Sequence, residues 1–346
     1  MRNDGKAELQ HYVPQLLLRL HVNSPSARRG TEQVWCFDKL TDKVFSPNIA
    51  GILSGTRFYE TEIDGEVVSL EESLTKIEDA VSPILIRIVD TRTVLDLTDE
   101  EREEIASFCA VQLVRTESFR QQMRDTHEAV ANALKRRGLD ISQQPSLATP
   151  SEEEIKISSF RMLIDAPATY GPHFLAKHWH LIQSSVEDPF HLGDHPVVVD
   201  SNSSVTGHRE SGLSSPGVSI YLPLCPTLCL VMTDSLLVSS LFEGGELVRR
   251  RYREIVNAMS RRQLTPEIVA DFKATKKTRD DAIREVRPMQ LGIPSAHNRQ
   301  VTLRANSLQM FYASRWIVSS RPDFSTPKMM IADSEDFRTR PKVQVE

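Results

Sequence analysis

Five histidines and two aspartates are concentrated between residues 173 and 195. They are His173, His178, His180, His191 and His195, with Asp188 and Asp194. On a β-strand, His178 and His180 would face the same side, because side chains alternate along a strand. Two imidazoles and a carboxylate meeting there could hold Zn²⁺ or Fe²⁺ and leave a position for an activated water. The sequence as a whole predicts no cofactor. A divalent metal held by His178, His180, His191 and His195 is nevertheless one hypothesis for this stretch. The other is that each histidine is hydrogen-bonded separately.

His11 and Asp194 are the candidate catalytic residues. His11 precedes Tyr12-Val13-Pro14, and the proline restricts the backbone there, so the position of His11 should be well defined. A histidine titrates near neutral pH and is a candidate general acid or base. If Asp194 lies nearby, it could orient the imidazole, as an acid–base pair requires. The alternative is that His11 only caps a strand through a hydrogen bond.

Gln112 and Arg115 are candidate ligand-binding residues. Both lie on an apolar stripe of a predicted helix, where residues three and four apart share a face. A buried arginine needs an anionic or carbonyl partner. That partner is either an internal aspartate, Asp38 or Asp194, or a phosphate or carboxylate of a ligand that the guanidinium binds through two hydrogen bonds. Asn306 lies on another apolar helix and must also be hydrogen-bonded, either to a loop or to a substrate.

A long helix should position Gln112 and Arg115. The pattern Thr98-Asp99-Glu100-Glu101 is typical of a capping box, in which the threonine and glutamate side chains each bind a backbone N–H of the first turn. The helix should run to about Arg137 and end at Gly138, a residue type common just after helix ends. Because a helix of about forty residues far exceeds the usual three or four turns, we expect a bend or break within it.

Periodicity and turn residues predict the other elements. A strand pair is expected over 34–38 and 43–45, and helices from residue 69 and after Ser151. Further strands are expected over 180–182, 196–199, 219–222 and 228–231. Further helices are expected over 247–262, 265–286 and 298–319. The predicted fold class is therefore α+β, predominantly helical with a small mixed or antiparallel sheet. We expect one large domain over 1–320, made of two sub-lobes (1–137 and 152–320) joined by the loop 138–151, and a disordered tail over 321–346.

Charge is unevenly distributed along a chain of average composition. The chain has 346 residues, of which 40% are hydrophobic and 26% charged, with a net charge of −5. Residues 60–104 hold fifteen acidic and four basic residues, whereas residues 249–287 hold twelve basic and six acidic residues. The basic region from Arg249 to Arg279 could contact nucleic-acid phosphates or a phosphorylated ligand. The alternative is a solvated helix pair whose charges offset the acidic region.

The chain is expected to be cytoplasmic. Its four cysteines are few for its length, which fits a reducing compartment without disulfides. No long apolar segment follows the N-terminal residues, so we expect no secretory signal. The uncharged segment 218–233 is shorter than the ~20 residues of a spanning helix, and Pro223 and Pro226 interrupt it. It is better explained by two buried strands joined near residues 224–226, and we expect no membrane partner.

Several short segments resemble the domain-of-unknown-function 4238 family. They are Gln10-His11-Tyr12-Val13-Pro14-Gln15, Trp35-Cys36-Phe37-Asp38-Lys39, Gln112-Leu113-Val114-Arg115-Thr116, Tyr221-Leu222-Pro223-Leu224-Cys225-Pro226 and the helix with Asn306. The resemblance spans roughly residues 8–320. The family's Ser-Asp-Asn-Pro-Val segment appears here as Gly193-Asp194-His195-Pro196-Val197, which keeps only the aspartate and the Pro-Val pair. The resemblance implies a shared architecture and shared polar positions but no activity.

Two functional hypotheses remain open. Under the first, the protein is an enzyme or binding protein that acts on a phosphorylated or nucleic-acid ligand. Under the second, it is a non-catalytic interaction or sensor module, as expected of uncharacterised families in host-defence systems. The common signatures of nucleotide binding, serine hydrolysis and zinc-dependent proteolysis are absent from the sequence. If the protein is an enzyme, His11, Gln112, Arg115 and Asp194 should line one cleft that solvent can reach. If their role is structural, these side chains should be sealed and hydrogen-bonded to one another.

Overall fold

A computed structural model describes residues 9–24, 28–63, 65–138, 150–201, 212–261 and 265–340. Its strands are β1 (Leu9–His11), β2 (Trp35–Asp38), β3 (Val44–Phe45), β4 (Ser54–Thr56), β5 (Glu60–Ile63), β6 (Glu66–Ser69), β7 (His178–Gln183), β8 (Leu192–Gly193), β9 (Val198–Ser201), β10 (Val218–Cys225), β11 (Leu228–Thr233) and β12 (Trp316–Ser319). Its α-helices are α1 (Gln15–Leu20), α2 (Glu71–Thr91), α3 (Asp99–Val114), α4 (Glu117–Arg136), α5 (Glu152–Leu175), α7 (Ser235–Ser260), α8 (Pro266–Gln290), α9 (Arg299–Tyr312) and α10 (Ser325–Asp333). Two short 3₁₀ helices are η1 (Ile49–Gly51) and η3 (Glu335–Arg338). The fold is α+β and predominantly helical, as predicted.

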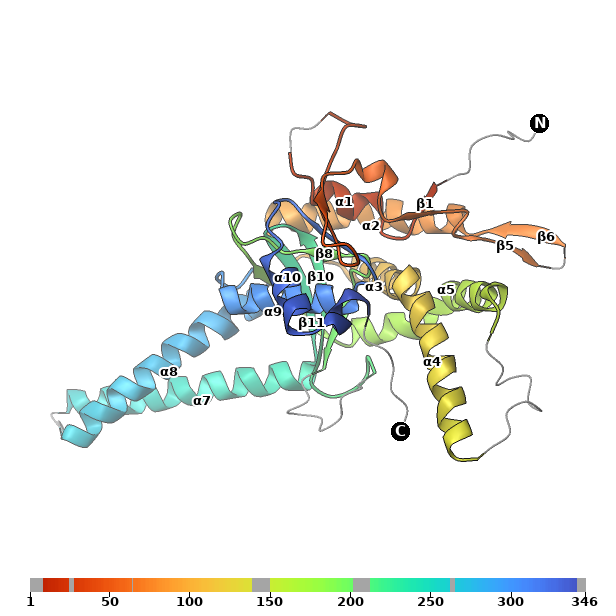
Figure 1. The fold of residues 1–346 in the computed structure, drawn as a ribbon. Helices are drawn as coiled ribbons and strands as arrows, with labels where there is room; N and C mark the ends of the chain where they lie inside the picture. Colours follow the sequence, from red (N-terminus) through yellow and green to blue (C-terminus); the bar gives the residue numbers. More distant parts are fainter. Residues whose placement is uncertain are drawn as a thin grey trace.

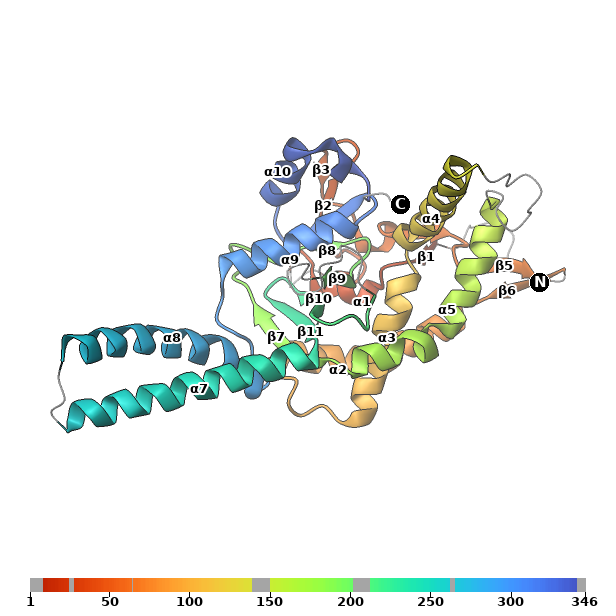
Figure 2. The same ribbon diagram turned by 90° about the horizontal axis from the view of Figure 1, so that it is seen from below.

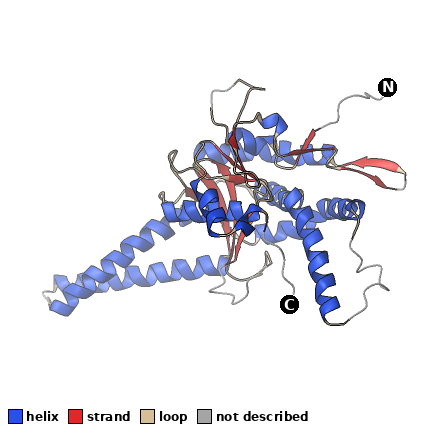
Figure 3. Cartoon of the chain, viewed as in Figure 1, coloured by secondary structure: helices blue, strands red, loops and turns tan. Residues whose placement is uncertain are grey.

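A four-stranded antiparallel sheet, in the order β7-β11-β10-β9, forms part of the main core. The uncharged segment 218–233 supplies β10 and β11, which confirms the prediction of two buried strands. Leu222 lies opposite Leu230 in this pair, and every residue of β11 is buried. Helices lie on both sides of the sheet, so its central strands read as continuous apolar runs (Figure 3).

A second four-stranded sheet has the order β3-β2-β12-β8 and joins distant parts of the chain. The predicted hairpin of β2 and β3 is confirmed. The predicted final helix, 298–319, is wrong in its last part, because α9 ends at Tyr312 and β12 pairs with both β2 and β8. Ile317 and Val318 are buried there. A short apolar run does not by itself distinguish a helix from a strand.

The predicted long helix is two helices. The capping box at Thr98 is confirmed and begins α3. The helix breaks after Val114, and the hydroxyl of Thr116 then accepts the N–H of Phe119 to begin α4. Gly138 follows α4 with φ of 76°, a conformation that glycine adopts at little cost. After the break, α4 leaves the end of α3 in a different direction (Figure 1).

The described C-terminal residues, up to residue 340, include α10 and η3. They occupy part of the stretch 321–346 for which the sequence analysis expected a disordered tail, and residues 341–346 lie outside the described residues. Phe324 and Ile331 are buried in an apolar cluster with Phe37 and Met310, which fixes α10 against the second sheet. Most of the predicted loop 138–151 also lies outside the described residues. The division into two sub-lobes stays a prediction.

Helices α7 and α8 pair side by side and project from the body of the molecule (Figures 1 and 2). Both are longer than predicted. Helix α7 already begins at Ser235, and α8 continues to Gln290. The rings of Tyr252 and Phe272 lie 5.6 Å apart at their centroids and join the two helices. We call this pair the α7–α8 hairpin. Within the described residues, no helix is both long and apolar enough to cross a membrane.

We predict that Gly292→Ala destabilises the protein by about 1–3 kcal/mol. Gly292 has φ of 60°, and a Cβ there would lie 3.0 Å from the backbone nitrogen of Leu95. Its carbonyl also accepts the N–H of Val94 and so joins the end of α8 to the segment before α3. Chemical denaturation measures the effect. The control Gly51→Ala has no atom within 4 Å of the new Cβ and should change the free energy of unfolding by less than about 0.5 kcal/mol. Equal stabilities of the two variants would contradict this account.

Candidate functional site

Arg115 is buried at the end of α3 and has every side of its guanidinium occupied. Its Nη1 donates to Glu78 Oε1 at 2.7 Å, and its Nη2 donates to the carbonyl oxygen of His11 at 2.7 Å. Its Nε lies 3.1 Å from the hydroxyl of Tyr59, which itself donates to the Arg115 carbonyl. The residue is only 4% exposed. These bonds attach the β1 segment to α2 and α3, and the carboxylate balances the buried charge.

The internal partner of Arg115 is therefore a glutamate, and the proposal of Asp38 or Asp194 is wrong. Asp38 instead accepts two hydrogen bonds from Arg315, at 3.1 Å from Nε and 2.9 Å from Nη2. These bonds hold the pKa of Asp38 below its usual value, although its burial acts in the opposite direction. Glu78 is one of fifteen acidic residues between residues 60 and 104. Its position in the sequence therefore gave no signal for this role.

Gln112 and Asn306 are buried and bind backbone atoms. Gln112 is 0% exposed, and its amide nitrogen donates to the carbonyl oxygen of Tyr12 at 2.9 Å. Asn306 accepts the N–H of His191 at 2.8 Å and donates to the carbonyl oxygen of Pro189 at 3.0 Å. Gln309, one helical turn later, binds the backbone at residues 193 and 196 in the same two-way manner. The sequence analysis missed Gln309, although its spacing from Asn306 places it on the same face of α9.

Asp194 is buried, and its carboxylate binds the turn between α9 and β12. Oδ1 accepts the N–H of Ser314 at 2.8 Å, and Oδ2 accepts those of Arg315 and Trp316 at 2.8 and 2.9 Å. Burial raises the pKa of Asp194, and the hydrogen bonds from these backbone amides oppose that rise. The nearby Lys39 is also buried and donates to two carbonyl oxygens at the end of α9. Burial lowers the pKa of Lys39 to about 8.

His11 and Asp194 have separate partners. The Nε2 atom of His11 lies 3.0 Å from the carbonyl oxygen of Ile49, and its Nδ1 lies 3.5 Å from the amide nitrogen of Gln15. Burial lowers the pKa of His11, and the hydrogen bond with the Ile49 carbonyl and the charge of Glu78 act against this effect. Within the described residues, no hydrogen bond joins His11 to Asp194. These contacts match the alternative in which His11 anchors a strand end.

The four candidate metal ligands lie in two different sheets. His178 and His180 share one face of β7, as expected, with ring centroids 6.2 Å apart. His191 and His195 flank β8 in the second sheet, where His191 contacts Phe324. In the part of the chain that the structure describes, no group of three or more histidine, cysteine, aspartate or glutamate residues is arranged to hold a metal ion.

His195 forms a buried contact with the start of α4. Its Nδ1 lies 2.6 Å from the hydroxyl of Thr116, and its ring stacks on Tyr312 with centroids 5.9 Å apart. The hydroxyl of Tyr312 donates to the carbonyl oxygen of Val199 at 2.8 Å. Burial lowers the pKa of His195 well below its usual value, and Arg340 adds to this effect. The ring of Tyr312 is thus held on one side by a neutral imidazole.

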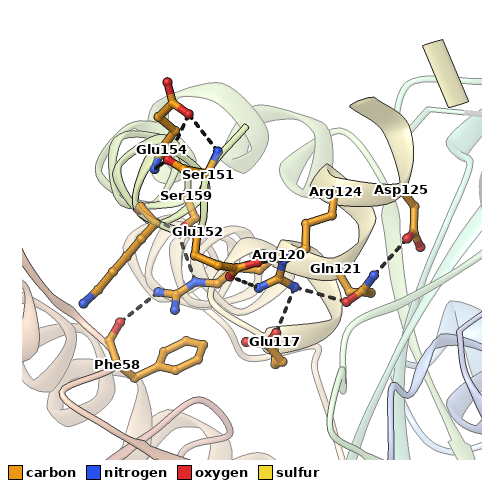
Figure 4. Close-up of polar contacts among 11 residues, drawn as sticks. Phe58, Glu117, Arg120, Gln121, Arg124, Asp125, Ser151, Glu152, Glu154 and Ser159 are labelled. Atoms are coloured by element: carbon orange, nitrogen blue, oxygen red, sulfur yellow. Dashed lines mark hydrogen bonds and ion pairs between the residues drawn. The ribbon is translucent and has the colours of Figure 1, made fainter. Parts of the chain in front are cut away.

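Two partly buried arginines of α4 extend the polar network toward the surface (Figure 4). Arg120 donates to the carbonyl oxygen of Phe58 at 2.8 Å and to the hydroxyl of Ser159 at 3.1 Å. Arg124 binds Glu152 through two hydrogen bonds, at 3.0 and 2.9 Å. These bonds join α4 to α5 and to the turn that carries Tyr59.

The polar side chains described above connect segments that are far apart in sequence. Several of them, including His11, Gln112, Arg115, Asp194 and Asn306, lie in the segments that carried the resemblance. The model of the family described as "Protein of unknown function (DUF4238)" matches residues 9–323. The chain belongs to this family. The part matched to DUF4238 includes all five predicted site residues, and it ends before α10 and η3. Neither the comparison with curated proteins nor the comparison with solved structures gave a match.

We predict that Arg115→Met lowers the free energy of unfolding by about 2–4 kcal/mol. The substitution leaves the His11 carbonyl, the Tyr59 hydroxyl and the Glu78 carboxylate without their donor. Denaturant unfolding measures the loss. The matched control is Lys76→Met on α2, because Lys76 forms an exposed ion pair with Glu72, and it should change stability by less than about 0.5 kcal/mol. A loss in Arg115→Met no larger than in this control would show that the guanidinium does not hold these segments together.

We also predict that the protein loses stability as the pH falls from 6.5 toward 4. Burial lowers the pKa of His180 to about 3 and those of His21 and His191 to about 4. An unfolded histidine titrates near pH 6.5, so in this range the unfolded chain binds more protons than the folded one. In His191→Gln the slope of the unfolding free energy between pH 5.5 and 4.5 should be smaller by about 1 kcal/mol per pH unit. The exposed His127→Gln should leave the slope as it is, and an unchanged slope in His191→Gln would be evidence against a buried neutral imidazole.

Proposed function

We propose that the protein is a non-catalytic nucleic-acid-binding protein whose contact surface is the α7–α8 hairpin. The observation that carries the proposal is a set of exposed cations on this hairpin that, within the described residues, form no ion pair. They are Arg250, Arg253, Arg261, Lys273, Lys276, Lys277 and Arg287. Such side chains bind phosphate groups by releasing condensed counterions, without any need for a pocket.

Helical geometry places Arg250, Arg253, Lys273 and Lys277 on the outer faces of the hairpin. On α7, Gly245, Tyr252 and Ile255 repeat at spacings of seven and three, and Gly245 and Tyr252 face α8. At 3.6 residues per turn, Arg250 and Arg253 then point away from α8. On α8, Phe272 and Val286 face α7. The same geometry directs Lys273 and Lys277 outward, whereas Lys276, one turn after Phe272, lies nearer the contact between the helices.

Acidic residues on the hairpin offset only some of its basic residues. Arg251 pairs with Asp271 between the two helices at 2.6 Å, and Arg249, Arg279 and Arg284 each pair with a nearby carboxylate. Arg279 also lies over the ring of Tyr252, at 4.0 Å from the ring centroid. These pairs stabilise the hairpin and leave the remaining cations free to contact a polyanion that approaches from outside.

The buried contacts support a structural role for the candidate catalytic and ligand-binding residues. Arg115 has a carboxylate partner, and Asp194 and Asn306 are each 3% exposed and bound to backbone groups. An enzyme that used them on a phosphorylated ligand would first have to break these bonds. The four cysteines are all buried and unpaired, which supports the proposal that the protein acts in the cytoplasm.

Binding of a fluorescent duplex DNA and of an RNA of equal length, measured over a range of salt concentrations, tests the proposal. In the quadruple glutamine variant of Arg250, Arg253, Lys273 and Lys277, affinity should fall by at least about tenfold. The slope of log K against log salt for the duplex should become smaller by about 3 to 4, because each lost phosphate contact removes about 0.9.

The control carries the same change of charge elsewhere on the surface. Its four substitutions to glutamine are at the exposed residues Arg57, Lys76, Arg161 and Lys328. This variant should keep the affinity and salt slope of the unmodified protein. Equal losses in both variants would mean that only net charge matters, and an absence of binding at low salt would refute the proposal.

A further inference from the structure

Arg340, the last residue that the structure describes, inserts its guanidinium between α4 and α9. Its Nη1 donates to the carbonyl oxygen of Ser118 at 3.1 Å and lies 3.2 Å from the hydroxyl of the same residue. The guanidinium carbon lies 5.4 Å from the centroid of the Tyr312 ring. Burial lowers the pKa of Arg340, and the charges of Asp125 and Asp194 act against this effect. We call the group Ser118, Asp125 and Tyr312 the Arg340 site.

The Arg340 site has the chemistry that guanidinium recognition requires. An aromatic face attracts a cation through its quadrupole, and carbonyl and hydroxyl oxygens accept hydrogen bonds from the planar N–H groups. The components of the site are also held in place. The Tyr312 hydroxyl is bound to the backbone of β9, and the amide of Gln121 donates to Asp125 at 2.8 Å (Figure 4). A cation that enters this site needs no rearrangement of its partners.

The occupant is held less firmly than the site. Burial lowers the pKa of Arg340, because its charge is partly desolvated and no carboxylate within the described residues forms an ion pair with it. No residue of η3, which leads into Arg340, is buried. Apart from Arg340, the segment is held by Arg338, which binds Asp42 and the carbonyl oxygen of Lys39 at the surface, and by the partly buried ring of Phe337, which contacts Phe311. Segments without fully buried side chains open at lower free-energy cost than the core.

The site and its occupant also differ in their relation to the family. Ser118, Asp125 and Tyr312 lie within residues 9–323, which the family model matches, whereas Arg340 lies beyond them. The site therefore lies within the matched region, and its occupant comes from a segment outside it.

We propose that the Arg340 site binds a guanidinium-bearing ligand and that Arg340 occupies it as a tethered competitor. The proposal does not depend on nucleic-acid binding by the α7–α8 hairpin. A tethered group has an effective concentration in the millimolar range. It therefore weakens the apparent affinity for a free ligand in proportion to the fraction of sites it fills. Removal of Arg340 should expose the intrinsic affinity of the site.

Calorimetric titration of the full chain with agmatine tests the proposal, because agmatine carries the arginine side-chain group without a peptide backbone. Arg340→Gln should bind agmatine at least about tenfold more tightly than the unmodified protein, and adding Tyr312→Leu should abolish the gain. The control Arg321→Gln removes an exposed arginine near the same end of the chain and should bind like the unmodified protein.

A second arm uses N-acetyl-arginine amide. Tighter binding of this compound than of agmatine would identify the ligand as an arginine within a peptide, and equal binding would identify the free side-chain group as sufficient.

Hydrogen exchange on the unmodified protein tests the same proposal without any substitution. Agmatine should speed the exchange of the backbone amides of residues 334–340 by displacing them, whereas 1-aminobutane, which lacks the guanidinium, should not. The proposal is overturned if Arg340→Gln binds agmatine no better than the unmodified protein, or if the gain persists with Tyr312→Leu. Exchange in residues 334–340 that agmatine leaves unchanged would also overturn it.

Discussion

The buried carboxylate of Asp194 is the interaction on which the second sheet depends. A carboxylate removed from water must be fully hydrogen-bonded, and this one is satisfied by three consecutive backbone N–H groups at residues 314–316. Those bonds fix the turn that ends α9 and directs β12 between β2 and β8. Asn306 and Gln309 of α9 bind the backbone of residues 191 and 193 and so hold β8 against α9. Irregular backbone that lies inside a protein needs such partners.

Arg115 performs the same task for the N-terminal segment. It binds the carbonyl oxygen of His11, and Gln112 binds that of the next residue, Tyr12, so α3 holds the end of β1 by two side chains. The polar residues that resemble the family's shared positions are thus mostly anchors of backbone. Most of their hydrogen-bonding groups are already used, with the buried amide oxygen of Gln112 as an exception within the described residues. A ligand that bound the used groups would have to compete with bonds inside the protein.

On the surface, by contrast, the α7–α8 hairpin carries cations that are not bonded within the protein. These cations stay solvated in the free protein, so they break no internal bond when they bind an anion. Arg340 is intermediate, because its guanidinium is partly desolvated and yet lacks a directly bonded carboxylate. Architectural residues are therefore those whose charge is paired inside the protein. The residues that we propose for binding are those whose charge is not. Residue type alone does not make this distinction, since arginines occur in all three environments.

The sequence by itself determined the elements that depend on neighbouring residues. The capping boxes at Thr98 and Ser151, the β2–β3 hairpin and the apolar strands β10 and β11 rest on contacts within a few residues, so their patterns could be read directly. It also marked Gln112, Arg115 and Asn306 as polar residues in apolar surroundings. Only the tertiary structure decided their partners, because one carboxylate in an acidic run, such as Glu78, is distinguished from the others solely by its position in space. For the same reason β12 and α10 could not be predicted from the sequence. They pack against β2 and Phe37, which lie hundreds of residues earlier in the chain.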